Sequence, residues 1–291
     1  MTRLHDQPSS LEDLSIDPAD TARGLEIFRR EGVVVAKGLL PAELVERTAA
    51  FLRTELDRLD GLFRRYGIAR DDAAAPAQLA ALMERPASEV PDKDRHVFLG
   101  HFPLEVRLAD TLRDIPRFVN GHPLLFELLA TERLFSHMPP TARFVIPHCS
   151  LARVPPHQDI SYNRHMGDFC VMWVPLVPID RACCSMAIYP RTQQLGELLA
   201  DSGPTSTSQW LPPIDGDAYG QAARVILEPL EPGDAVLFGP RTVHESMPNV
   251  SDRVRLSCDF RFFGEQGRSD KHFLDLARDT VVAPQPAGAR A

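Results

Sequence analysis

The second half of the chain has the pattern that most restricts its fold. From Ala142 onward, short β-rich runs alternate with Pro, Gly and Asp, which are turn-forming residues. Short strands at this spacing predict a β-sandwich or a double-sheet jelly roll. The predicted strands cover residues 143–146, 150–154, 168–178, 184–189, 224–228, 235–239 and 253–263.

The first half of the chain shows helical periodicity, interrupted by one short strand. Residues 19–30 suit a short helix that Gly32 can cap, and the β-branched run at 33–35 predicts a strand. Pro41 suits position N1 of a long helix that extends to Gly67, because its missing N–H has no partner there. The remaining predicted helices cover residues 72–85 and 122–134.

Together these patterns predict a mainly β protein with α-helices that buttress a jelly-roll core. Both chain ends are rich in Pro, Ser or Ala and are expected to be flexible. The polar segment 201–223 is expected to be a lid or binding loop, because loops this long are often functional. The predicted organisation is a flexible arm at 1–18, a single domain at 19–280 with a helical part at 19–140 and a core at 141–263, and a flexible tail at 281–291.

The composition argues against several classes of protein. A net charge of −8 disfavours nucleic acid or an anionic membrane as the main partner. Because no apolar run reaches the roughly 18 residues of a membrane span and the start lacks a signal-peptide core, we expect a cytoplasmic protein. Five cysteines without a C-x-x-C pair predict neither a disulfide framework nor a structural zinc site. The oligomeric state is not determined by the sequence.

A triplet and a distant histidine together form a candidate metal site. On an extended segment, His157 and Asp159 would project from one face, so that both could bind one ion. His244 follows the predicted strand at 235–239 and could supply the third ligand. Two imidazoles and one carboxylate form the facial triad that leaves coordination positions open on Fe(II).

An arginine eleven residues after His244 is a candidate anchor for a co-substrate. Along the strand at 253–263, Arg253, Arg255, Ser257, Asp259 and Arg261 alternate with apolar residues, so one face is strongly polar. The strand alone leaves two possibilities, a solvated outer face or a face that looks into the barrel; the spacing from His244 favours the second. A buried guanidinium would then bind a carboxylate through two hydrogen bonds, and Ser246 could donate another.

These residues resemble the phytanoyl-CoA dioxygenase family of Fe(II)- and 2-oxoglutarate-dependent oxygenases. The resemblance rests on the H-x-D triplet, Trp173, Pro232-Gly233-Asp234, His244-x-Ser246, Asn249 and Arg255, and it extends to Phe28-x-x-x-Gly32-Val33-Val34-Val35. It implies a double-stranded β-helix in which His157, Asp159 and His244 bind iron. It also implies that Arg255 and Ser246 bind 2-oxoglutarate and that Trp173 lines the same pocket.

The resemblance further implies a reaction. O2 and 2-oxoglutarate would be consumed, succinate and CO2 released, and an unactivated C–H bond of a small-molecule metabolite hydroxylated or otherwise oxidised. Related halogenases have a small residue in place of the carboxylate ligand, so Asp159 favours hydroxylation. The segment from Cys183 to Thr192 departs from the Asn-Gly and Pro-Gly-Ser-His pattern of many members, which leaves the substrate open. The alternatives are a cupin-like metalloenzyme that does not use 2-oxoglutarate and a non-catalytic binding protein.

Several further polar residues are candidates for substrate contacts. Tyr162, Arg164 and His165 follow the metal segment closely, and Arg143 lies on the strand that enters the core. Each could instead belong to a solvated turn or pair with a structural acid, as could Arg241. His148 is not expected to be a fourth ligand, since that would block a position that oxygen needs.

Overall fold

The computed structural model describes residues 10–198, 214–267 and 269–284. Its α-helices are α1 Thr21–Glu31, α2 Ala42–Arg58, α3 Asp60–Arg65, α4 Ala75–Met83, α5 Asp92–Phe98, α6 Leu104–Arg107, α7 Asp114–Val119 and α8 Pro123–Leu129. Short 3-10 helices are η2 Glu12–Leu14, η3 Asp110–Arg113, η4 Asp159–Ser161, η5 Arg164–Met166, η6 Thr192–Leu195 and η7 Gly216–Ala218. The strands are β1 Ser15–Ile16, β2 Val33–Ala36, β3 Phe135–His137, β4 Thr141–Val145, β5 Cys170–Pro175, β6 Met186–Tyr189, β7 Val225–Leu227, β8 Ala235–Phe238, β9 Val243–Ser246, β10 Arg255–Phe263, β11 Phe273–Asp275 and β12 Thr280–Val282.

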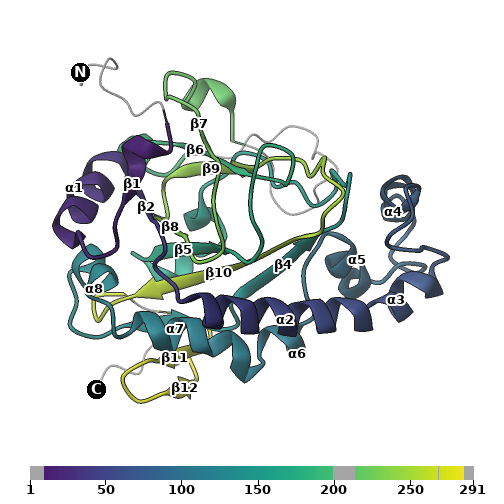
Figure 1. Cartoon of the computed structure of the whole chain (residues 1–291), viewed down its shortest axis with the longest axis horizontal. Helices are drawn as coiled ribbons and strands as arrows, with labels where there is room; N and C mark the ends of the chain where they lie inside the picture. The colour runs from purple at the N-terminus through teal and green to yellow at the C-terminus, as the bar shows by residue number, and fades with distance from the viewer. Residues whose placement is uncertain (1–9, 199–213, 268, 285–291) are drawn as a thin grey trace.

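The strands form two sheets, as a jelly roll requires. The larger sheet has the order β1-β2-β8-β5-β10-β3-β11-β12, with β4 paired to β10 as well. The smaller sheet has the order β7-β6-β9, and Figure 1 shows it above the larger one, with α2 and α7 on the opposite side. Except for the parallel pair β1–β2, the strand pairs are antiparallel. The predicted double-stranded β-helix with helices outside it is confirmed.

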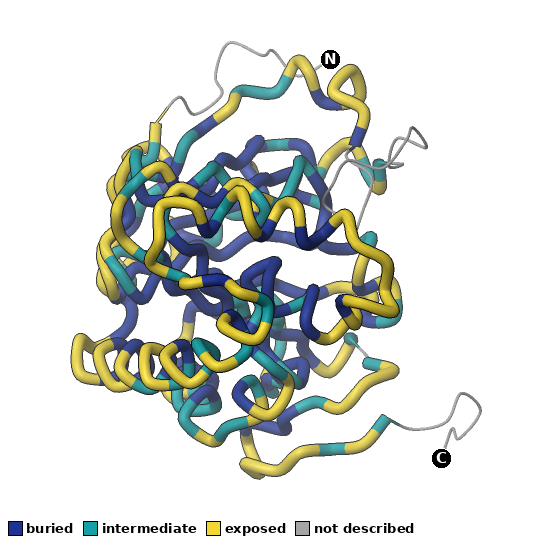
Figure 2. The backbone as a smooth tube through the Cα atoms, turned by 90° about the vertical axis from the view of Figure 1, so that its right-hand side faces the viewer, coloured by how far each residue is buried: buried dark blue, intermediate teal, exposed yellow. Residues whose placement is uncertain are grey.

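The core lies between the sheets and under the helices. Buried residues concentrate in the central strands and on the inward sides of the helices (Figure 2). Strand β2 is buried at all four positions, so it lies between two covered faces. In α2 the buried positions follow helical spacing, because one stripe of an amphipathic helix faces the core. This stripe consists of Leu44, Val45, Thr48, Ala49, Leu52 and Leu56.

Several predicted elements are confirmed within a few residues. Gly32 ends α1 in the left-handed conformation, at φ 77°, and its N–H donates to the carbonyl of Phe28. This backbone conformation favours glycine because a Cβ would be strained there. The long predicted helix is divided into α2 and α3 at Leu59, and Pro41 precedes α2 as its N-cap rather than occupying N1.

Other predictions were wrong. The segment 150–154 is irregular rather than a strand, since it is followed by Pro155 and Pro156, which have no N–H to continue a ladder. The strand predicted at 253–263 begins only at Arg255. Sequence periodicity also missed β3, β9, β11 and β12, which are three or four residues long and obtain their stability from pairing with neighbours.

The chain ends are more ordered than the prediction of an arm at 1–18 and a tail at 281–291 implied. Residues 1–9 and 285–291 lie outside the described residues. Ser15 and Ile16 pair with β2, and Leu14 and Ile16 are buried in the core. Val281 and Val282 belong to β12, which pairs with β11. Much of the predicted lid, 201–223, also lies outside the described residues.

The five cysteines are all free and buried, as expected of small apolar residues. No helix in the described part of the chain is long and apolar enough to cross a membrane.

Candidate metal centre and co-substrate site

Two histidines from distant parts of the chain meet through a backbone bridge. His157, on the extended segment before η4, exchanges two hydrogen bonds with His244 of β9, with N···O distances of 3.0 and 3.1 Å. Their ring centroids lie 4.2 Å apart. The bridge explains why residues so distant in sequence project side by side, because directly paired residues share one face.

The tautomers of both histidines follow from their neighbours. Nδ1 of His157 lies 2.8 Å from the carbonyl oxygen of Pro155, and Nδ1 of His244 lies 3.0 Å from that of Thr242. A carbonyl oxygen can only accept, so each Nδ1 carries a proton, and Nε2 is the nitrogen that each ring can offer to a metal. Burial, with a smaller effect of the nearby His157, lowers the pKa of His244 to about 3, so this imidazole is neutral and able to bind a metal.

Asp159 completes the cluster at the start of η4. One of its carboxylate oxygens lies 3.6 Å from Nε2 of His157 and the other 3.0 Å from Nη2 of Arg261. Burial alone would raise the pKa of Asp159, but Arg261 and the two histidines outweigh it and hold the pKa well below its usual range. Potential ligand atoms of His157, Asp159 and His244 lie within 4.8 Å of one another.

These three residues fit Fe(II) by their donor chemistry. Two neutral imidazoles and one ionised carboxylate are the ligand set of non-haem iron sites with open positions. All three are buried, whereas an accidental acidic cluster is usually exposed. The predicted grouping of His157, Asp159 and His244 is therefore present in the structure.

Arg255 is buried beside this cluster and has unused hydrogen-bonding capacity. Its side chain is 2% exposed, Nη1 donates weakly to the carbonyl oxygen of Cys184 at 3.4 Å, and Nε has no partner among the described residues. The guanidinium carbon lies 5.9 Å from the ring centroid of Trp173. A buried guanidinium without an acid is costly unless a ligand supplies one, so a carboxylate fits this position.

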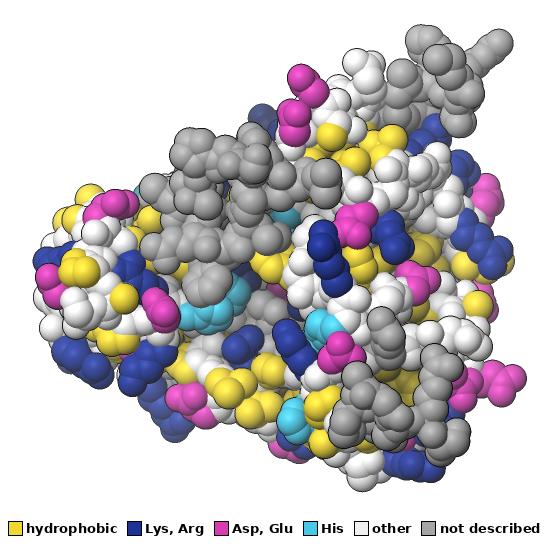
Figure 3. Space-filling view, turned by 180° about the vertical axis from the view of Figure 1, so that it is seen from behind, with side chains coloured by type: hydrophobic (Ala, Val, Ile, Leu, Met, Phe, Trp, Pro, Cys, Tyr) yellow, Lys and Arg dark blue, Asp and Glu magenta, His cyan; other side chains and the backbone are white. Residues whose placement is uncertain are grey.

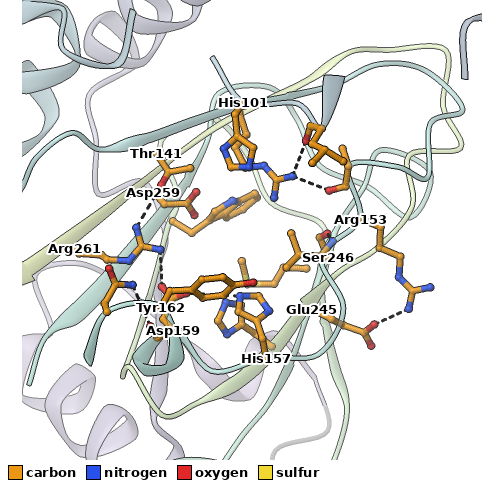
Figure 4. A pocket seen from close by; sticks show the side chains of 18 of the residues that line it. His101, Thr141, Arg153, His157, Asp159, Tyr162, Glu245, Ser246, Asp259 and Arg261 are labelled. Carbon is orange, nitrogen blue, oxygen red and sulfur yellow. Dashed lines mark hydrogen bonds and ion pairs between the residues drawn. The ribbon is translucent and has the colours of Figure 1, made fainter. Parts of the chain in front are cut away.

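Ser246 lies on β9 two residues beyond His244. Its hydroxyl oxygen accepts from the backbone N–H of Val154 at 2.7 Å, which leaves the hydroxyl proton free to donate. Ser246, Trp173 and Arg255 all line the cavity that contains the three candidate ligands. The cavity has a volume of about 490 Å³, and Figure 4 shows its polar lining.

The sequence-predicted substrate residues divide into two groups. Arg143 and Tyr162 line the cavity, and the Tyr162 ring packs edge-on against that of His157, with centroids 5.6 Å apart. Arg164 is not part of the cavity lining and pairs with Glu197 at 2.5 Å. His165 accepts from the backbone N–H of Asp270 at 3.3 Å and also lies outside the cavity lining.

Other predicted residues have structural contacts. Arg253 precedes β10 and pairs with Asp180 at 2.6 Å on the surface, so it does not share the inward face with Arg255. Asn249 donates to three backbone carbonyl oxygens at 2.7–3.3 Å. His148 pairs with Asp252 on the surface and is not part of the candidate metal cluster.

Sequence reasoning assigned no role to several cavity residues. Asp259 and Arg261 lie on β10, where alternation had indicated a polar inward face, so the signal was present. His96, His101 and Arg107 come from the helical part of the chain and carried no such signal. They line the cavity only because this part folds back onto β4, where His101 forms a bridge with Arg143.

A double-stranded β-helix with two histidines and an aspartate beside a buried arginine defines the class of non-haem Fe(II)- and 2-oxoglutarate-dependent oxygenases. A family model for phytanoyl-CoA dioxygenase (PhyH) matches residues 28–257, and the chain belongs to this family. It is therefore an Fe(II)- and 2-oxoglutarate-dependent oxygenase, which uses O2.

Individual relatives agree with this assignment. The chain is 29% identical over 253 residues to 1-deoxypentalenic acid 11-beta-hydroxylase of Streptomyces arenae, covering 83% of this chain and 81% of the relative. It resembles in fold the epimerase SnoN, solved with Fe3+, alpha ketoglutarate and nogalamycin RO, with a TM-score of 0.55, 20% identity and 87% of each chain covered. EctD from S. alaskensis, solved with 2-oxoglutarate and 5-hydroxyectoine, has a TM-score of 0.55 at 15% identity, covering 88% of this chain and 79% of EctD.

Proposed function

We propose that this enzyme hydroxylates an unactivated C–H bond of a small-molecule metabolite. The substrate R–H, O2 and 2-oxoglutarate would give R–OH, succinate and CO2, with one oxygen atom in the alcohol and the other in succinate. The observation that carries the proposal is the shared cavity: three candidate iron ligands and the under-bonded guanidinium of Arg255 line it together. The relative named as a hydroxylase supports the same reaction type.

The side chains have distinct proposed roles. His157, Asp159 and His244 would hold Fe(II), which with 2-oxoglutarate supplies the oxidising chemistry. Arg255 would bind the distal carboxylate of 2-oxoglutarate, with Ser246 as a further donor. The backbone carbonyls behind the two imidazoles keep each Nε2 directed at the metal position.

Three further groups shape the site. The Arg261 guanidinium holds one oxygen of Asp159 and leaves the other free for the metal. Trp173 supplies an apolar wall against Arg255 and excludes water, which strengthens each charged contact in the cavity. Tyr162 lies against the ring of His157, where a substrate entering the cavity would meet it.

Spectroscopy tests the proposed ligand set before any substrate is known. Anaerobic addition of Fe(II) and 2-oxoglutarate should give the visible charge-transfer band of a chelated 2-oxo acid. His244→Ala should abolish the band, whereas Arg253→Leu, a surface change, should leave it intact. A wild-type spectrum without the band at saturating concentrations would contradict the proposal and favour a cupin-like or non-catalytic protein. Once the band is established, succinate release across a metabolite panel identifies substrates.

A further inference from the structure

The cavity lining contains more positive than negative charge. Four cations of the lining form no ion pair with any described residue: Arg107, Arg143, Arg255 and Lys271. Among the acids of the lining, Asp259 alone forms no ion pair with a described residue. Burial raises the pKa of Asp259, so its carboxyl opposes the cations less than an exposed one would.

The remaining charges of the lining neutralise one another. Arg153 pairs with Glu245 at 2.8 Å, and Arg261 pairs with Asp159 at 3.0 Å. Arg255 is the proposed partner of 2-oxoglutarate. An excess of positive charge therefore remains after the metal and co-substrate side is accounted for, and Figure 3 shows Lys, Arg and His side chains gathered around a hollow on this face.

Arg143 is the most deeply placed of these remaining cations. It is 9% exposed, and its Nη2 donates to the carbonyl oxygens of Leu99 and Ala152 at 3.1 and 2.8 Å. Its Nε is buried without a partner among the described residues. The two carbonyls fix the guanidinium from behind, and no carboxylate of the described residues pairs with it.

The neighbouring His101 lies on the same wall of the cavity. It forms a backbone bridge with Arg143, and its buried Nδ1 also has no partner among the described residues. Figure 4 shows His101 across the cavity from His157 and Asp159. Gly100 allows this close approach, because a Cβ there would collide with the carbonyl oxygen of Phe144, and its φ is +85°.

Apolar side chains make up much of the rest of the cavity lining. Leu99, Leu151, Trp173, Met186 and Phe238 contribute to it. A ligand that fits both the wall with Arg143 and the apolar part of the lining has an apolar body and an anionic end. A carboxylate suits a guanidinium better than a neutral group does, because its hydrogen bonds are charge-assisted.

We propose that Arg143, with His101 beside it, binds a carboxylate of the substrate and so directs the apolar body of that substrate toward the metal ligands. This rests on the proposed function and names the substrate class of the same site: apolar carboxylic acids. Arg143 acts as a specificity-determining residue, separate from the co-substrate anchor Arg255.

Calorimetry on matched probes tests the proposal without turnover. The probes are adamantane-1-carboxylate, dodecanoate and abietate, each with its primary amide and its primary amine. They are titrated into anaerobic protein loaded with Fe(II) and saturating 2-oxoglutarate, so that the co-substrate occupies Arg255. At least one acid should bind tenfold or more tightly than its amide and its amine. The charge-transfer band recorded before each titration reports the proposed function separately.

Variants of Arg143 test whether the preference for the acid over its amide depends on this residue. Arg143→Leu should weaken binding of the acid about 10- to 100-fold and leave the amide unchanged, with the 2-oxoglutarate half-saturation within threefold of wild type. Arg143→Lys keeps the charge and should retain part of the preference, which covers the case that the leucine variant does not fold. Arg253→Leu, the surface control, should match wild type.

Three results would overturn the proposal. The first is that no acid in the panel binds more tightly than its amide. The second is that the amines bind best, which would make Asp259 the recognition group. The third is that Arg143→Leu weakens 2-oxoglutarate and the acid alike, which would make Arg143 a second co-substrate anchor. Loss of the charge-transfer band with the acid preference retained would refute the proposed function alone.

Discussion

Replacement of Arg255 by leucine is the most informative perturbation of the co-substrate site. The side chain is 2% exposed and makes one long hydrogen bond, to the carbonyl oxygen of Cys184 at 3.4 Å, and no ion pair with a described residue. Leucine fills part of the same volume against Trp173 and removes the buried charge. Because no acid is left unpaired, we expect the variant to fold and to leave the three candidate iron ligands intact.

The magnitude follows from the hydrogen bonds that would be lost. A hydrogen bond to a charged group contributes about 1.5–3 kcal/mol, and a bidentate pair contributes up to twice that. Retained contacts such as the Ser246 hydroxyl reduce the net loss, so about 1.4–4 kcal/mol is expected. The half-saturation concentration for 2-oxoglutarate should therefore rise by one to three orders of magnitude, at about 1.4 kcal/mol per factor of ten.

The assay is the half-saturation of the anaerobic charge-transfer band, together with Fe(II) affinity measured by competition with a chelator. Arg255→Lys should fall between wild type and Arg255→Leu, since lysine keeps the charge but cannot bind bidentately. Arg253→Leu is the matched control, because Arg253 pairs with Asp180 on the surface. If Arg255→Leu kept the wild-type half-saturation, this arginine would not be the anchor, and the 2-oxoglutarate assignment of the site would fail.

Three further predictions address the metal site and the fold. Asp159→Gly should lower iron content after loading to about a tenth of wild type or less, since its carboxylate is the only anionic ligand proposed; normal iron content by metal analysis would rule it out as a ligand. Burial holds the pKa of His137 and His244 at about 3, so the unfolded chain binds more protons than the folded one as the pH falls through about 6.5. Metal-free protein should lose about 1.4 kcal/mol per histidine between about pH 7.5 and 5.5, as measured by urea unfolding, whereas equal midpoints at both pH values would contradict this. Gly100→Ala should cost about 1–3 kcal/mol in the same assay, because of its positive φ and because its Cβ would collide with the carbonyl oxygen of Phe144. Gly61→Ala, with open space around it, should cost nothing, and equal stabilities of the two variants would refute the close-approach argument.

Much of the fold and of the candidate site could be predicted from local sequence patterns. Alternation along 253–263 identified an inward polar face, and the spacing from His244 selected Arg255 on it. The H-x-D triplet supplied two candidate ligands. These features are readable because strand geometry determines which neighbours share a face, and this depends only on residues close in sequence.

Contacts between distant segments could not be read in this way. The bridge that places His157 beside His244, the ion pair between Asp159 and Arg261, and the position of His101 against Arg143 each join segments far apart in the chain. Likewise, β9 and β11 are too short to have a periodicity of their own, and they exist because a neighbouring strand satisfies their backbone groups.

The sequence by itself predicted the jelly-roll core, the candidate ligands His157 and Asp159 and the polar strand face that carries Arg255, because each lies in a local pattern that strand geometry interprets. His244 was added from its place after a predicted strand, and the resemblance to the family implied the double-stranded β-helix and the iron-binding role of the three residues. Only the tertiary structure decided which charges remain unpaired in the cavity. Arg164 and Arg253 form ion pairs with acids at the surface. Arg143 and Arg255 are buried and form no ion pair with a described residue. Pairing depends on which side chains the fold brings within reach, and burial determines how strongly an unpaired charge requires a ligand.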